Sequence, residues 1–269
     1  MDIQNQPGLN GLDIDKVGIC DLAYPIEIFD KARERQQTVA QINMYVDLPR
    51  KFKGTHMSRF VEVLNENRAE IMLENFGQIL RVIASKLEAK SAHMEIAFKY
   101  FLEKEAPVSR SRSFMGYDCR FIGSYSQSGD EDFMIEVRVP VMNLCPCSKE
   151  ISETAAHNQR SEVTVQVRYT DFVWIEDIIG LVEKSASCEL YALLKRPDEK
   201  YVSERAYDNP RFVEDIVRLV ADDLMHDKRV SWFSVRSKNF ESIHNHNAYA
   251  FIERDKRVPD GELRTASNA

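Results

Sequence analysis

Hydrophobic and polar residues alternate along several stretches of the chain, which is the pattern of β-strands with one buried face. Strands are predicted at residues 40–48, 94–102, 113–125, 133–141, 163–167, 230–237 and 247–252. Between them, apolar residues recur at helical spacing. This spacing predicts helices around residues 60–64, 79–87, 175–182 and 212–224. Strand pairs that flank helix pairs favour an α+β fold, with antiparallel sheets and paired helices on one face.

The order of strands and helices is similar in the two halves of the chain, so two modules are predicted. The polar segment SQSGDED, near residue 130, has the composition of a turn and indicates the boundary between them. The N-terminal module then covers residues 17–130, and the C-terminal module covers residues 131–253. The two ends, residues 1–16 and 254–269, are polar and without periodicity, so they are predicted to be flexible tails.

Composition narrows the classes of function. The 269 residues carry a formal net charge of -7, which argues against a general nucleic-acid binder, because such proteins usually present a basic face. A nucleotide substrate remains possible, since a few Lys and Arg side chains suffice to hold phosphates. The sequence shows no signal peptide and no apolar run as long as a membrane span. The 5 cysteines are therefore expected to be reduced thiols of a cytoplasmic protein with no membrane partner.

The segment NLCPCSKEISETAAHNQRS contains the strongest candidate for chemistry. Cys145 and Cys147 flank Pro146, and proline favours extended backbone in the residue before it. Both thiols are therefore predicted to face one cavity. Together with His157 they offer the ligand types of zinc and related divalent metals. A C-x-C pair without C-x-x-C knuckles favours an open catalytic site. The alternative is two packed core cysteines and a surface histidine.

A second cluster lies in the segment NFESIHNHNAY, where Glu241, His244 and His246 bring one carboxylate and two imidazoles close together. Imidazoles are suited to proton transfer near neutral pH. The same composition is also typical of a solvated turn, so both interpretations stay open.

Two carboxylates stand out in the segment 193–217. Pro197 and Asp198 predict a turn with Glu199 at its tip, where this residue would be a surface carboxylate. Glu214 lies at the margin of the apolar stripe of a predicted helix. It is either solvated or accepts hydrogen bonds from a guanine-like edge, which offers two neighbouring N–H donors.

Basic and polar side chains crowd the start of another predicted helix, in the segment KGTHMSRF. The free N–H groups at a helix N-terminus suit a phosphate group, and ordinary capping by Thr55 or Ser58 is the alternative. The candidate phosphate ligands are Lys53, His56, Ser58 and Arg59.

The stretches GTHMSRF, NLCPCSKEIS, AHNQRS, LLKRPDEKYV and NFESIHNH together resemble the type IB family of GTP cyclohydrolases. The resemblance covers about residues 53–250. It implies tandem tunnelling-fold (T-fold) modules, assembled as a homotetramer with active sites at the subunit interfaces. It also implies hydrolysis of GTP to formate and 7,8-dihydroneopterin triphosphate, the first step of folate (tetrahydrofolate) and pterin biosynthesis.

The resemblance also assigns roles to the candidate residues. It implies one divalent metal ion per site, Fe(II), Mn(II) or Zn(II), with Cys145, His157 and Glu199 as ligands. Water activated by the metal would attack C8 of guanine. Glu214 would anchor the guanine, and Lys53, His56, Ser58 and Arg59 would hold the phosphates. The residues implied at the reacting centre are Cys147, Glu241 and His244.

Two other functions are compatible with parts of the sequence. One is a thiol-based enzyme of the same fold, such as a nitrile reductase acting on a deazapurine, with Cys147 or Cys145 as the nucleophile. The other is a non-enzymatic nucleotide-binding protein that retains Glu214. The combination of cysteine, histidine and glutamate favours the cyclohydrolase over both.

Overall fold

The computed structural model describes residue 4, residues 11–67 and residues 75–258. The chain divides into two compact units, of which unit 1 comprises residues 1–100 and 118–136 and unit 2 comprises residues 101–117 and 137–269. The predicted boundary near residue 130 falls in the turn between strands β4 (Arg112–Ser126) and β5 (Glu131–Leu144). The units interleave along the sequence because β3 (Ser91–Glu105), β4 and β5 each contribute residues to both.

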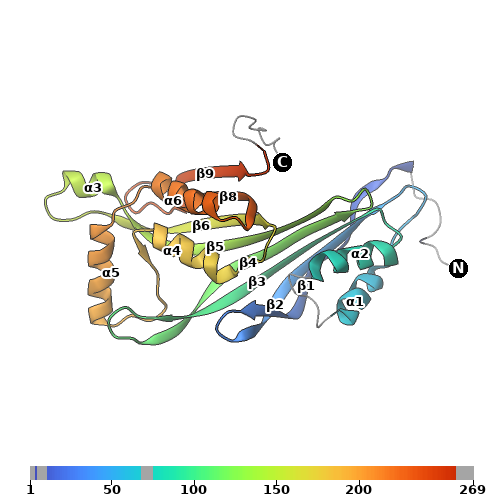
Figure 1. The fold of residues 1–269 in the computed structure, drawn as a ribbon, viewed down its shortest axis with the longest axis horizontal. Coiled ribbons are helices and arrows are strands. Elements are labelled where there is room, and N and C mark those ends of the chain that lie inside the picture. Colours follow the sequence, from blue (N-terminus) through green and yellow to red (C-terminus); the bar gives the residue numbers. More distant parts are fainter. Residues whose placement is uncertain (1–3, 5–10, 68–74, 259–269) are drawn as a thin grey trace. The chain divides into compact units, whose positions relative to one another are not determined.

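Unit 1 is an antiparallel sheet with two helices (Figure 1). Strand β1 (Ile14–Asp30) pairs with β2 (Glu34–Leu48), and β2 pairs with β3. Helices α1 (Met57–Glu66) and α2 (Phe76–Lys86) contact each other, and α1 contacts β1. Every second residue of β2 is buried from Ala40 onwards, as the alternation predicts.

Unit 2 carries the remaining elements and follows the same pattern. Strands β6 (Asn158–Tyr169), β8 (Val230–Asn239) and β9 (Ala248–Asp255) are antiparallel neighbours, and β7 (Cys188–Glu189) pairs with β5. Helices α4 (Ile175–Ser185) and α6 (Val213–His226) pack against each other, and α6 contacts β8 and β9 (Figure 1). The two short or polar helices are α3 (Pro146–Ile151) and α5 (Arg196–Asp208).

The predicted fold class is confirmed: the chain is an α+β protein of antiparallel strands in the order β1-β2-β3-β4-β5-β6-β8-β9, with paired helices in each unit. The buried interior of unit 2 is built by alternate strand residues such as Val163, Val165 and Val167. Residues 14–16 belong to β1 and residues 254–255 to β9, so the predicted tails overlap these strands. Residues 1–3, 5–10 and 259–269, which make up most of both tails, lie outside the described residues.

Helix α5 differs from the turn that Pro197 and Asp198 predict. Proline is tolerated in the first turn of a helix, and Pro197 occupies that position. The helix buries only Asp198, Val202 and Ala206, so its sequence lacks the apolar stripe that marks the other helices.

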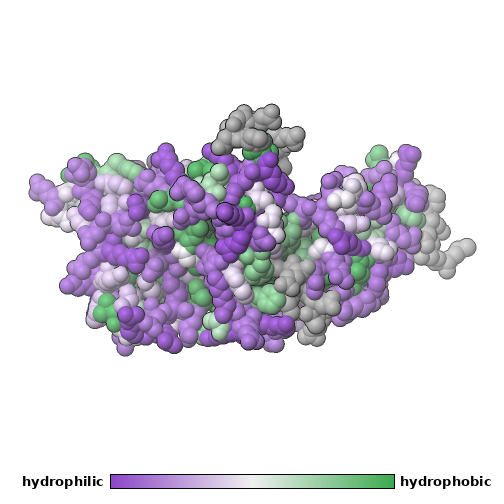
Figure 2. All heavy atoms as spheres, viewed as in Figure 1, coloured by the Kyte–Doolittle hydropathy of each residue, from purple (hydrophilic) through white to green (hydrophobic). Residues whose placement is uncertain are grey.

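No helix among the described residues is long and apolar enough to cross a membrane. On the face shown in Figure 2, hydrophilic residues cover most of the surface and apolar ones lie scattered among them. Isolated apolar residues of this kind are normal on a protein surface.

The buried carboxylate of Asp198 joins α5 to the loop after β3. Its Oδ1 accepts hydrogen bonds from the backbone N–H groups of Val108 (2.9 Å) and Ser109 (2.8 Å), and its Oδ2 accepts one from Lys195 (2.8 Å). Burial alone would raise the pKa of Asp198, but hydrogen bonds from Ser109, Lys195 and Val108 outweigh burial and hold this pKa well below its usual range. The carboxylate is therefore charged in the folded protein and fixes where α5 begins.

We expect Asp198→Asn to lower the melting temperature at neutral pH, because an amide N–H₂ would face backbone donors. Since the folded-state pKa of Asp198 is depressed, its stabilising contribution is fully present above the ordinary Asp pKa of about 4 and is lost as the pH falls through the folded value. Thermal unfolding at a series of pH values should show the two proteins converging in acid. Asp208→Asn, at the exposed end of the same helix, serves as the control. A difference in melting temperature that is the same at every pH would contradict this account.

Candidate active site

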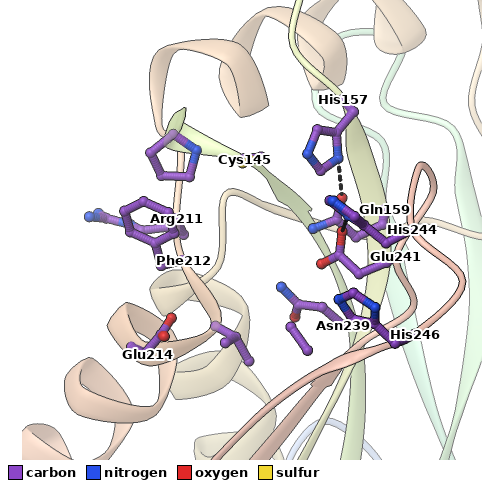
Figure 3. A pocket seen from close by; sticks show the side chains of 13 residues that line it. Cys145, His157, Gln159, Arg211, Phe212, Glu214, Asn239, Glu241, His244 and His246 are labelled. Carbon is purple, nitrogen blue, oxygen red and sulfur yellow. Dashed lines mark hydrogen bonds and ion pairs between the residues drawn. The ribbon is translucent and has the colours of Figure 1, made fainter. Parts of the chain in front are cut away.

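A pocket of about 270 Å³ lies in unit 2, where β5 and β8 end and where β6 and α6 begin (Figure 3). Pro146, Phe212, Val213 and Ala248 supply apolar surface to its wall, between polar and ionisable side chains. The polar and ionisable side chains that line it are Cys145, His157, Gln159, Arg211, Glu214, Asn239, Glu241, His244 and His246.

Cys145 and His157 reach the pocket because a backbone hydrogen bond holds their segments together. The N–H of Cys145 donates to the carbonyl oxygen of His157 at 3.1 Å, which places the end of β5 beside the start of β6. Cys145 is also the residue before α3, and its Sγ accepts a hydrogen bond from the backbone N–H of Ser148 at 3.4 Å. The structure thus brings a thiol and an imidazole into one pocket.

Cys147 is placed differently from the prediction. It lies in α3, is exposed and does not line the pocket. Pro146 stands at the start of α3, so the backbone after Cys145 is helical. The rule that residues two apart share a face holds for extended chain only. This corrects the expectation that both thiols face one cavity.

The ring of His157 is oriented by two neighbours. Its Nδ1 lies 3.0 Å from Oε1 of the buried Gln159 and 3.4 Å from Oγ of Ser242. An amide oxygen can only accept, so Nδ1 carries the hydrogen in this pairing, and in the neutral ring the lone pair then lies on Nε2. A metal-binding histidine has the same need, since its second nitrogen is usually held by a hydrogen bond.

The loop after β8 supplies a carboxylate and two imidazoles to one wall of the pocket (Figure 3). Nδ1 of His244 lies 3.6 Å from Oε2 of Glu241, whose side chain is only 11% exposed. The rings of His244 and His246 stack at 5.2 Å, and the rings of His157 and His244 lie 6.5 Å apart edge to face. Such a cluster can give and take protons near neutral pH.

Glu214 lies across the pocket, on the first turn of α6 (Figure 3). This helix begins at Val213, and Asp215 accepts a hydrogen bond from the N–H of Phe212 at 2.9 Å. Glu214 is exposed, so its carboxylate is open to a ligand. Beside it, Nε of Arg211 is buried without a hydrogen-bond partner among the described residues. The N–H of Arg211 donates to the carbonyl oxygen of Leu144 at 3.1 Å, which holds the start of α6 beside the end of β5.

Glu199, the third metal ligand implied by the resemblance, is not brought to this pocket. It is exposed on α5, where its carboxylate lies 3.1 Å from the guanidinium of Arg196. Among residues 11–67 and 75–258, no three His, Cys, Asp or Glu side chains form a group that could hold a metal ion. Cys145 and His157 supply the sulfur and nitrogen donor types that divalent metals bind, but the complete set of Cys145, His157 and Glu199 is not assembled among these residues.

The candidate phosphate ligands belong to unit 1, whereas the residues that line the pocket all belong to unit 2. His56 is the residue before α1, and its side chain makes no capping hydrogen bond. Nη1 of Arg59 donates to the carbonyl oxygen of Lys86 at 3.0 Å and so joins α1 to the end of α2. Lys53 and Ser58 are exposed.

Three of the polar residues that line the pocket were not predicted from the sequence: Gln159, Arg211 and Asn239. Gln159 shares the buried face of β6 with Ser161 and Val163, and Asn239 shares that of β8 with Val235. A polar residue at a position where the alternation calls for an apolar one would have been the signal for both. Arg211 precedes α6 in irregular chain and carries no comparable signal.

Comparison with known proteins gives matches over nearly the whole chain. A family model described as type I GTP cyclohydrolase folE2 matches residues 1–250. A GTP cyclohydrolase FolE2 from Geobacter metallireducens is 55% identical over 257 residues, which cover 96% of this chain and 98% of the relative. One from Syntrophus aciditrophicus is 57% identical over 255 residues, covering 95% and 100%.

Among solved structures, a uricase from Bacillus fastidious superposes with a TM-score of 0.55 at 9% sequence identity, covering 91% of this chain and 94% of that one. A hyper-thermostable uricase mutant gives a TM-score of 0.51 at 10% identity, covering 95% and 94%. The fold is therefore the α+β antiparallel arrangement of the uricases, with tandem T-fold modules, and the low identity carries no statement about activity.

Proposed function

We propose that this chain, which belongs to the type I GTP cyclohydrolase folE2 family, hydrolyses GTP to formate and 7,8-dihydroneopterin triphosphate. The reaction would be the first step of folate and pterin biosynthesis in the cytoplasm. The observation that carries the proposal is the pocket itself, where Cys145 and His157 lie with the Glu241–His244 pair and face Glu214. The family assignment replaces the type IB family to which the sequence resemblance points, because the matching family model carries the folE2 description.

Recognition of guanine is assigned to Glu214. The edge of guanine that carries N1–H and the 2-amino group offers two neighbouring donors, and a carboxylate can accept from both. The carboxylate of Glu214 is open to a ligand, since the residue is exposed and lines the pocket. Binding this edge at α6 directs the imidazole ring of the base toward the opposite wall.

Proton transfer is assigned to Glu241 and His244 on that opposite wall. Addition of water at C8, opening of the imidazole ring and release of formate each require a proton to be removed or delivered. A histidine beside a carboxylate can do both repeatedly. The 3.6 Å separation between Nδ1 of His244 and Oε2 of Glu241 is within the range of an ion pair, so the two side chains are close enough to act together.

The proposal includes one divalent metal ion per site, Fe(II), Mn(II) or Zn(II), with Cys145 and His157 as ligands. Such an ion, when bound, supplies positive charge that makes water easier to deprotonate. Glu199 is kept as the proposed third ligand, although its carboxylate pairs with Arg196 in this structure. Cys147 keeps a proposed role near the reacting centre.

We also propose a homotetramer with active sites at the subunit interfaces. Of the residues that line the pocket, Arg211 is the one with a permanently positive side chain, whereas a triphosphate needs several positive partners. A neighbouring subunit could supply Lys53, His56, Ser58 and Arg59, and strands at the ends of a sheet favour association. Light scattering that shows a fully active monomer would contradict this assembly.

Protein incubated with GTP labelled with ¹³C at C8 should release labelled formate, together with a pterin that fluoresces after oxidation. Treatment with EDTA should abolish both products, and addition of Fe(II), Mn(II) or Zn(II) should restore them. Release of phosphate without labelled formate would show that the protein attacks the triphosphate and not the base.

Two cysteine variants provide the control for the metal. Cys145→Ala should purify without bound metal and should not recover activity when metal is added, because a thiolate is a strong ligand for these ions. Cys147→Ala, two residues away and outside the pocket, should retain its metal. Equal metal content in both variants, measured by mass spectrometry of the elements, would show that Cys145 is not a ligand.

Glu214→Gln should weaken GTP binding by about 2–3 kcal/mol, because it replaces one acceptor by a donor that faces the guanine N–H groups. The melting temperature should change little, since the residue is exposed. Asp223→Asn makes the same change of charge at an exposed position of α6 outside the pocket and should bind GTP normally. If both variants bind GTP as the unaltered protein does, Glu214 is a solvated helix residue.

A further inference from the structure

Asn239 carries a hydrogen-bond donor for which the described residues provide no partner. It lies at the end of β8, is 3% exposed and lines the pocket. Its Oδ1 accepts hydrogen bonds from Oγ of Ser161 at 2.6 Å and from Nδ2 of Asn143 at 3.1 Å. Its own Nδ2 donates to none of the described residues. Because Asn239 lines the pocket, this nitrogen is open to the pocket, where a ligand or water can accept from it.

The orientation of the Asn239 amide is fixed by a chain of hydrogen bonds that starts at the backbone. The N–H of Ser187 can only donate, and it faces Oδ1 of Asn143 at 3.5 Å. Nδ2 of Asn143 is thereby turned toward Oγ of Ser161, at 2.7 Å, and toward Asn239. Ser161 then donates its own hydrogen to Asn239. A flipped Asn239 would set its N–H₂ against the N–H₂ of Asn143, donor against donor.

The donor therefore points into the pocket, on the wall that faces Glu214 (Figure 3). Glu241 follows Asn239 by two residues and lies on the same wall. If Glu214 binds the N1–H edge of guanine, the imidazole edge is the part of the base that reaches Asn239. This edge presents N7, an acceptor bonded directly to C8.

We propose that Nδ2 of Asn239 donates a hydrogen bond to N7 of the guanine base. This inference rests on the proposed function and adds a positioning residue to it. The hydrogen bond orients C8 toward Glu241 and His244. It also withdraws electron density from the N7–C8 bond and stabilises the negative charge that collects on N7 when water adds to C8. Asn143 and Ser161 act through Asn239, because they hold its amide in the donating orientation.

The test compares the binding of GTP with that of 7-deaza-GTP, in which a C–H replaces N7, in EDTA so that no turnover occurs. Isothermal calorimetry should show that the unaltered protein prefers GTP by about tenfold, the effect of one hydrogen bond. Asn239→Asp keeps the accepting oxygen and replaces the donor by an acceptor. It should lose about tenfold in GTP affinity and should no longer prefer GTP over 7-deaza-GTP.

Ser237→Ala is the matched control, because Ser237 is buried on the same strand but does not line the pocket; it should keep the preference. Ser161→Ala leaves Asn239 in place but frees its amide to turn, so it should reduce the preference for GTP over 7-deaza-GTP. If Asn239→Asp fails to fold, Ser161→Ala takes its place as the deciding variant. If Asn239→Asp folds and keeps the preference, the inference is overturned while the proposed function stays intact. If Asn239→Asp does not fold, an unchanged preference in Ser161→Ala has the same meaning. Failure of the unaltered protein to bind GTP would instead refute the proposed function.

Discussion

The hydrogen bonds among Asn143, Ser161 and Asn239 join β5, β6 and β8 where these strands reach the pocket. Ser161 and Asn239 are directly opposed in the register of β6 and β8. Because side chains alternate between the two faces of a strand, a shift of one residue would turn a whole strand over. The three-residue network therefore fixes which side chains face the pocket, and Cys145 and Glu241 each follow one of its members by two residues.

This network lies at the end of an otherwise apolar interior. Buried apolar positions on the same strands are Val141 and Val163, each two residues from a member of the network, and Val235, four residues from Asn239. A buried polar group without a partner costs about 1–3 kcal/mol, so the network is stable only while its members satisfy one another. The same cost makes the network specific for one strand register, since a misaligned strand would leave two or three of these groups unpaired. The amide of Asn239 has a donor left over, and this is the part of the network that a ligand can use.

The sequence was sufficient to predict the fold class, because alternation in the strands and apolar stripes in α2, α4 and α6 are strong periodic signals. Helix α5 was missed since its residues are mostly polar and its start is fixed by a buried carboxylate, Asp198, that no periodicity reveals. Cys145 is extended, as the following proline predicts, but the placement of Cys147 was wrong because the extended backbone was expected to continue, whereas α3 begins at Pro146. Cys145 and His157 were singled out by their ligand chemistry, but the hydrogen bond that sets them side by side depends on strand pairing.

The crystal structure of the protein with GTP bound in EDTA tests the central claim most directly, namely that the pocket holds the base in one orientation. The account predicts that Glu214 contacts the N1–H edge of guanine, that N7 lies within hydrogen-bond distance of Nδ2 of Asn239, and that C8 faces Glu241 and His244. A base bound outside the pocket, or one whose imidazole ring is turned toward α6, would contradict it.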